Sequence, residues 1–260
     1  YLSKTILSGV RPYELEILRE MLLKESISVK KVQENFLEKY NFKFQTEDIE
    51  KAIDVLQGHF VSKKEEYQKY CHLDLINYDG KNSFSRMAGF AERLLHIEFY
   101  NQINDIVAVG LKRYSDKYMK RGNKEVPFIM YEKYSRRDVS LLMNCGKDLS
   151  STMYGMKRID EDVFIFVTYH KEQAGDNKNY VDGKPDYADI FEDNMTFLWD
   201  SQMGKGIDSS YMRDVTMAKR KHLFVKKSDA ESSFYYMGQF DIMDIKEAQK
   251  ENNKGKKEVI

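Results

Sequence analysis

The segment VFIFVTY, residues 163–169, constrains the fold of this chain more than any other stretch. It is short, rich in β-branched and aromatic residues, and followed by a polar loop at 171–186. Runs of this kind form β-strands. Further strands are predicted at Phe128–Tyr131, Met153–Met156, His222–Val225 and Phe234–Phe240. Residues 127–247 are therefore expected to form a β-rich domain.

The first part of the chain follows a helical period instead. Leu15, Leu18 and Leu22 recur at helical spacing, and later apolar residues do the same. The pair Gly122-Asn123 is a credible boundary between the two patterns. We therefore expect an α+β chain with a helical connector at 1–122, the β-rich domain, and a frayed, charged tail at 248–260.

Within the helical part, residues 12–78 have the element order of a winged-helix unit: three short helices followed by extended segments. A winged helix would offer a second DNA contact. The third helix, TEDIEKAIDVLQG, argues against this, because its acids outnumber the single Lys51 and repel phosphate. We favour the alternative, a helical connector that only packs against a neighbouring part of the protein.

Charge and cysteine content exclude several classes of protein. The 42 basic and 42 acidic residues give a formal net charge of zero, so any DNA-binding face must be local. Cys71 and Cys145 are too few and too far apart for a disulfide framework or a thiolate zinc site. No apolar run reaches the length of a membrane span. We expect a cytoplasmic piece of a longer protein, with no membrane contact.

Four ordered segments carry a family resemblance: YEKYSRRDVSLLMN (131–144), SSTMYGMKRIDEDVFIFVTYHKE (150–172), TFLWDSQMGKGIDSS (196–210) and KHLFVKKSDAESSFYYMG (221–238). Together they resemble the C-terminal domain of unknown function of large bacterial proteins. In those proteins a DEAD/DEAH-type helicase is joined to a phospholipase-D-type nuclease domain. One departure is Ala230, where a glycine is expected.

The resemblance implies a parent protein of a restriction or phage-defence kind that uses ATP and a divalent metal. It also implies that helicase and nuclease domains of the same chain are partners. By fold analogy, the terminal domain is similar to pseudo-barrel DNA readers. The helicase and nuclease motifs themselves, G-x-x-x-x-G-K-[ST] and H-x-K-x-x-x-x-D, are absent from this sequence. We therefore expect no cofactor and no reaction in this chain.

Three groups of residues have the composition of an active site but not its spacing. The acids Asp186, Asp189, Glu192 and Asp193 lack the pattern of a calcium loop. The acids at 160–162 precede a strand that ends at His170, but no E-x-K pair follows at nuclease spacing. Ser201 with His170 or His222 lacks the frame of a nucleophile. No catalytic or metal-binding residue is expected.

Residues suited to DNA contact are of two kinds. Lys and Arg before and after the strand at 222–225 would neutralise phosphates. Aromatic, amide and hydroxyl side chains near strand ends would meet bases. The candidate DNA-binding residues are Tyr154, Lys157, Tyr169, His170, Trp199, Ser201, Gln202, Arg213, Lys219, Arg220, Lys221, Lys226 and Lys227. For the charged residues a solvated strand edge is an equally common explanation, and for Trp199 and Tyr154 it is core packing.

The sequence therefore predicts a non-catalytic module that binds double-stranded DNA for a larger helicase–nuclease protein. The alternative is an assembly or regulatory module that docks onto a partner and gates the nuclease or helicase. The zero net charge and the acidic third helix favour the alternative. The recognised DNA sequence or modification and the oligomeric state, a homo-oligomer included, stay open.

Overall fold

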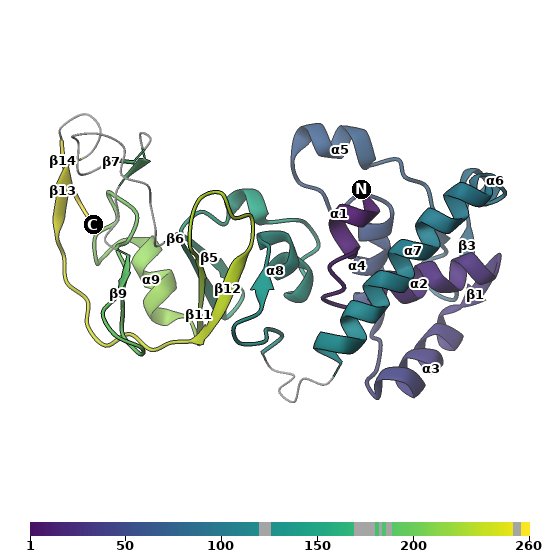
Figure 1. Cartoon of the computed structure of the whole chain (residues 1–260), viewed down its shortest axis with the longest axis horizontal. Coiled ribbons are helices and arrows are strands. Elements are labelled where there is room, and N and C mark those ends of the chain that lie inside the picture. The colour runs from purple at the N-terminus through teal and green to yellow at the C-terminus, as the bar shows by residue number, and fades with distance from the viewer. Residues whose placement is uncertain (120–125, 169–179, 182–183, 186–188, 252–255) are drawn as a thin grey trace. The chain divides into compact units, whose positions relative to one another are not determined.

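The computed structural model describes residues 1–119, 126–168, 180–181, 184–185, 189–251 and 256–260, and these form two compact units (Figure 1). Unit 1 contains Tyr1–Pro127 and Arg137–Ser151, and unit 2 contains Phe128–Arg136 and Thr152–Ile260. The predicted α+β fold class is confirmed. Among the described residues, every helix is too short or too polar to span a bilayer.

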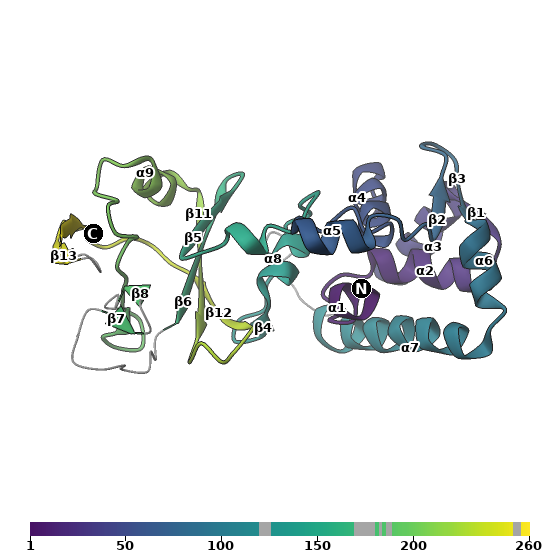
Figure 2. The same cartoon turned by 90° about the horizontal axis from the view of Figure 1, so that it is seen from above.

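Unit 1 combines helices with short strands. Its helices are α1 (Leu2–Ile6), α2 (Tyr13–Leu23), α3 (Val29–Tyr40), α4 (Thr46–Leu56), α5 (Lys64–Tyr70), α6 (Ala88–Leu94), α7 (Ile97–Arg113) with a π-helical turn at Tyr114–Tyr118, and most of α8 (Arg136–Leu142), which a 3-10 turn at Ser150–Thr152 follows. Its strands are β1 (Ser26–Ser28), β2 (Ile76–Tyr78) and β3 (Ser83–Arg86). They pair antiparallel in the order β1-β3-β2 at one end of the unit (Figure 2).

In chain order the first part of unit 1 contains α2, β1, α3, α4, α5, β2 and β3, so a further helix, α5, lies between the three expected helices and the paired strands β2 and β3. Leu15 and Leu18 of α2 are completely buried, as their helical spacing requires. The Ser28 hydroxyl caps α3 by accepting a hydrogen bond from the Lys31 backbone, at 3.2 Å. The Asp79 carboxylate fixes the β2–β3 turn by accepting hydrogen bonds from the backbone of residues 81–83.

Unit 2 is built around a mixed sheet. Among the described residues the sheet contains β4 (Lys133–Tyr134), β12 (Phe234–Gln239), β11 (Arg220–Lys226), β6 (Asp162–Thr168) and β5 (Met156–Ile159), in that order. β6 and β11 are parallel, and the other neighbours are antiparallel. The sheet curls into a half-barrel. Outside it lie helix α9 (Ser210–Met217) and the hairpins β7–β8 (Tyr180–Val181, Lys184–Pro185), β9–β10 (Ile190–Phe191, Phe197–Leu198) and β13–β14 (Gln249–Glu251, Lys257–Val259).

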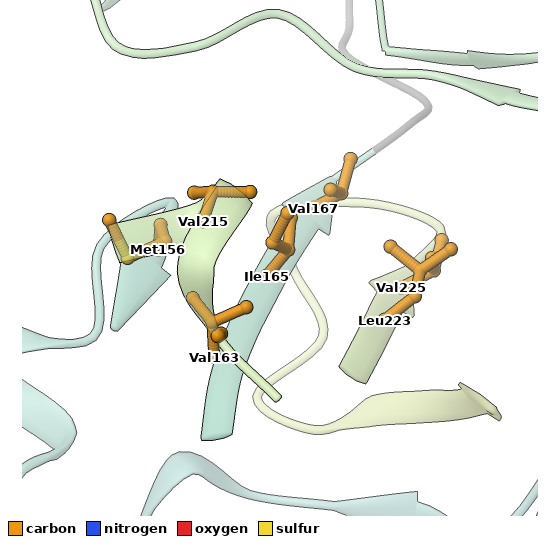
Figure 3. Packing of buried hydrophobic residues seen from close by; sticks show 8 residues of the cluster. Met156, Val163, Ile165, Val167, Val215, Leu223 and Val225 are labelled. Carbon is orange, nitrogen blue, oxygen red and sulfur yellow. The ribbon is translucent and has the colours of Figure 1, made fainter. Parts of the chain in front are cut away.

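Strand β6 is buried on both faces, which explains the apolar run that dominates the sequence. Val163, Ile165 and Val167 point to one face and pack with aliphatic residues of β5, β11 and α9 (Figure 3). Phe164 and Phe166 point to the other face, into a cluster of aromatic rings. Successive side chains of a strand alternate between faces, so a strand covered on both sides needs a continuous apolar run.

Several local predictions differ from the structure. Residues 128–131 do not form the expected strand: Tyr131 adopts φ 66°, and the regular strand β4 begins only at Lys133. The strand expected at Met153–Met156 begins only at Met156, after Gly155 at φ 71°. The tail expected to fray instead forms the β13–β14 hairpin, in which oppositely charged residues pair directly across the strands.

Candidate functional site

A cation stacked among aromatic rings occupies one end of the sheet in unit 2. The Arg136 guanidinium lies 5.2 Å from the ring centre of Tyr154 and 5.0 Å from that of Phe234. It lies 5.5 Å from the centre of Phe166, and Lys226 Nζ lies 5.3 Å from that of Phe234. These separations lie within the range of cation–π attraction. We call these five residues the cation–aromatic cluster.

The strand pairing explains why these residues meet. Because β6 and β11 are parallel and Lys226 pairs with Thr168, both strands finish at the same end of the sheet. β12 runs antiparallel to β11, so its first residue, Phe234, lies at that end too. Gly155 turns the chain into β5 there, and its carbonyl accepts a hydrogen bond from the Phe166 backbone, at 2.7 Å. Tyr154 is thereby held at the sheet end with 69% of its surface exposed.

The charges of the cation–aromatic cluster are partly desolvated and partly balanced. Burial lowers the pKa of the Arg136 guanidinium, and the nearby Tyr154 and Asp229 oppose the shift. Lys226 pairs with Asp229 at 3.3 Å and donates a hydrogen bond to the Glu231 carbonyl at 3.1 Å. Arginine remains charged in such surroundings. The cluster therefore offers a positive charge beside an exposed ring, a combination that suits a phosphate and a stacked base.

The opposite end of the same sheet holds a buried polar network. Arg220 donates two hydrogen bonds to the Asp162 carboxylate, at 2.6 and 2.7 Å. The ring of His222 lies between Asp162, at 2.9 Å from Nε2, and the Tyr236 hydroxyl, at 3.0 Å from Nδ1. Asp162 and His222 are 2% and 1% exposed. We call these four residues the Asp162 network.

The pKa directions in this network agree with a charged Asp162 and a neutral His222. Burial works against the charged form of Asp162, but hydrogen bonds from Arg220 and His222 outweigh it and hold the Asp162 pKa below its ordinary value. Burial lowers the His222 pKa despite the attraction of Asp162, and burial raises that of Tyr236. With its proton on Nε2, a neutral His222 would donate to Asp162 and accept from Tyr236, which satisfies both contacts. The network is therefore satisfied internally and stabilises the sheet.

The structure divides the predicted DNA-binding cations between these two ends of the sheet. Lys226 and Lys227 lie at the end that carries the cation–aromatic cluster, and Lys227 is exposed. Lys219 and Arg220 lie at the other end, where Glu161 and Asp162 pair with them. Lys221, also at that end, donates to the Ala218 carbonyl at 2.8 Å.

The remaining candidates lie elsewhere in unit 2 or outside the described residues. Lys157 is half-buried on β5, opposite Phe164, and Arg213 is exposed on α9. Tyr169 and His170 lie outside the described residues. The structure therefore joins Tyr154 and Lys226 in one cluster but does not bring the thirteen candidates together.

The Trp199–Gln202 segment lies against the aliphatic face of the sheet. Trp199 packs against the aliphatic core and stacks on Tyr211, with ring centres 6.2 Å apart. Ser201 is buried and donates to the Lys205 carbonyl at 3.0 Å, whereas Gln202 is exposed. The surroundings of Trp199 therefore agree with core packing, the alternative explanation given for this residue.

The groups with an active-site composition have other contacts in the structure. Both ring nitrogens of His222 are occupied by Asp162 and Tyr236, so this ring has no nitrogen left for Ser201. The Asp193 carboxylate accepts hydrogen bonds from the backbone of Met195 and Thr196, as in a turn. Asp186 lies outside the described residues, and among the described ones no cluster of three or more His, Cys, Asp or Glu has the geometry of a metal site.

Sequence reasoning missed Arg136, the centre of the cation–aromatic cluster. It is the first residue of α8. Its ring partners are 18, 30 and 98 residues away in sequence, at positions 154, 166 and 234. Only the order of strands in the sheet brings them together, and no local pattern reports that order.

Two family models match the chain, each over a different part of the sequence. The model for a domain of unknown function, DUF3427, matches residues 128–260, and that for a second, DUF8090, matches residues 1–117. The first covers more than half of the chain, so the chain belongs to the DUF3427 family. This confirms the resemblance to a domain of unknown function. A search of curated proteins found no match.

Proposed function

We propose that the chain is a non-catalytic module that recognises duplex DNA through the cation–aromatic cluster of unit 2. The observation that carries the proposal is the exposed Tyr154 ring, which lies 5.2 Å from the Arg136 guanidinium at a strand end. Aromatic rings stack on a base that is extruded from the duplex, and neighbouring cations neutralise phosphates. The exposed Lys227 and the partly exposed Lys226 extend the positive surface.

We also propose that this module is the C-terminal part of a larger ATP-dependent helicase–nuclease protein of restriction or antiphage defence. The four ordered segments of the family resemblance support this parent, and the match to the DUF3427 family agrees with the resemblance at the level of the domain. The helicase and nuclease domains of that chain would supply the reaction, ATP and metal. In this arrangement the module directs the enzyme to its DNA.

A titration of the intact chain with a short fluorescent duplex, followed by anisotropy, tests DNA binding. We expect binding at about 50 mM salt that weakens with added salt, with a log–log slope of roughly −2 to −4 for two to four phosphate contacts. Replacing the exposed Lys227 by Gln should reduce the slope by about 1. The matched variant Lys63→Gln, at an exposed position in unit 1, should leave it unchanged. Absence of binding at low salt would overturn the proposal.

An assembly function is the second candidate, and a different observation favours it. Leu95 and Ile97, at the junction of α6 and α7, are 84% and 67% exposed. Adjacent exposed apolar side chains are typical of protein-interaction surfaces. If the chain does not bind DNA in the titration, assembly becomes the better-supported function of the chain.

A further inference from the structure

Residues 137–151 are assigned differently by the family models and by packing. They lie within the DUF3427 match, which begins at residue 128. In the structure they are part of unit 1, together with the residues that the DUF8090 model matches. A segment of the C-terminal family domain therefore completes the N-terminal unit.

The first anchor of this segment is Arg11, which is 6% exposed. It is paired with Glu14, which is 1% exposed, and its Nε lies 2.9 Å from the Glu14 carboxylate. Its Nη1 donates to the Leu141 carbonyl at 2.7 Å and to Asn144 Oδ1 at 2.9 Å. A buried guanidinium needs several acceptors, and the 137–151 segment supplies two of them.

The second anchor is Arg137. Its guanidinium bridges Asp148 of the same segment, at 2.7 Å, and Glu66 of α5, at 2.9 Å. The Asp148 backbone N–H donates to the Phe60 carbonyl at 2.6 Å, and the Ser62 hydroxyl donates to the Asp148 carbonyl. Asp148 is 3% exposed and the Arg137 side chain 12%, so the ion pair between them is largely sheltered from water.

The third anchor involves the first turn of α4. Asn144 Nδ2 donates to Asp48 Oδ1 at 2.8 Å. In helix-turn-helix proteins the N-terminal residues of the second helix, here α4, contact base edges in the major groove. In this chain the first turn of α4 carries Glu47 and Asp48, and Asp48 already accepts a hydrogen bond from the 137–151 segment. The negative charge of this turn would also repel phosphate groups.

We propose that the winged-helix-like part of unit 1 is a protein-docking surface for residues 137–151, and that α4 makes no contact with DNA. The segment offers the Leu141 carbonyl and the Asn144 amide oxygen to Arg11, and Arg137 to Glu66. The Asp148 backbone meets the Phe60 carbonyl and the Ser62 hydroxyl. The docking holds the two family domains together by contacts additional to the chain between them. The proposal holds whether or not unit 2 binds DNA.

Cutting the intact, folded protein between the two family matches tests the docking. A protease site is inserted after Gly122, the purified chain is cleaved, and the nicked protein is run on size-exclusion chromatography at micromolar concentration. We expect the two pieces to elute together, at the position of the uncut 30.8-kDa chain. Separation of the pieces, each with its secondary structure retained by circular dichroism, would overturn the proposal.

A matched pair of variants shows whether residues 137–151 carry the association. Asn144 and Asn41 both adopt left-handed backbone, with φ 51° and 55°, so replacement by glycine introduces no strain at either position. Asn144→Gly removes the hydrogen bonds to Arg11 and Asp48 and should weaken the association of the nicked pieces by about tenfold or more. Asn41→Gly should leave it unchanged. Equal affinities for the two variants would contradict the assignment.

Discussion

Replacing Asp162 by alanine is expected to destabilise unit 2 by about 3–5 kcal/mol, the range for breaking a buried ion pair. The substitution leaves Arg220 without its two acceptors and the His222 Nε2 without a partner, in a site where Asp162 and His222 are almost completely buried. Urea unfolding monitored by circular dichroism gives the change in the free energy of unfolding.

The neighbouring residue provides the control for this prediction. Glu161 pairs with Lys219 at 3.3 Å, but both side chains are about two-thirds exposed. Exposed pairs contribute little, so Glu161→Ala should change stability by less than about 0.5 kcal/mol. Asp162→Asn keeps the size of the side chain and removes its charge, so it should fall between the two. If Asp162→Ala is no more destabilising than Glu161→Ala, the Asp162 network has no structural role.

Replacing Tyr154 by alanine is expected to weaken DNA binding while leaving the fold intact. Stacking of a base on an aromatic ring contributes about 1–3 kcal/mol, which corresponds to a loss of affinity of roughly 5- to 150-fold. Tyr154 is 69% exposed, so its removal leaves little buried space, and the thermal midpoint should move little. Anisotropy titrations with the same duplex measure the change in affinity.

Tyr67→Ala is the matched control for Tyr154→Ala. Tyr67 is also exposed, at 44%, but it lies on α5 of unit 1. It should leave the affinity unchanged. If Tyr154→Ala binds DNA as tightly as Tyr67→Ala, the exposed Tyr154 ring takes no part in binding. The main support for DNA recognition through the cation–aromatic cluster would then be removed.

The strands of unit 2 show how far local pattern predicts structure. The β6 and β11 segments were predicted from their apolar and β-branched residues, because a strand covered on both faces must be apolar throughout. Their parallel pairing was not predicted, because it depends on contacts between residues that are 58 positions apart in sequence. The strand ends were also misplaced where Tyr131 and Gly155 adopt positive φ.

The candidate site shows the same limit. A run of cations around Lys219–Lys221 suggested a phosphate-binding surface, but the sequence does not say which acids lie beside them. The structure places Asp162 against Arg220 through the parallel register of β6 and β11. Reversing the charges of this run would therefore disturb the fold together with any DNA contact. The exposed Lys227 is the better residue for a binding test, because Lys226 is paired with Asp229 and bonded to the Glu231 carbonyl.

Hydrogen–deuterium exchange of the intact chain, with and without duplex DNA, shows where DNA protects the backbone and so locates the binding surface. We expect slower exchange in residues 154–158 and 226–234, around the cation–aromatic cluster, and unchanged exchange in α4. Protection of α4, or DNA binding without protection around the cluster, would contradict DNA recognition by this cluster.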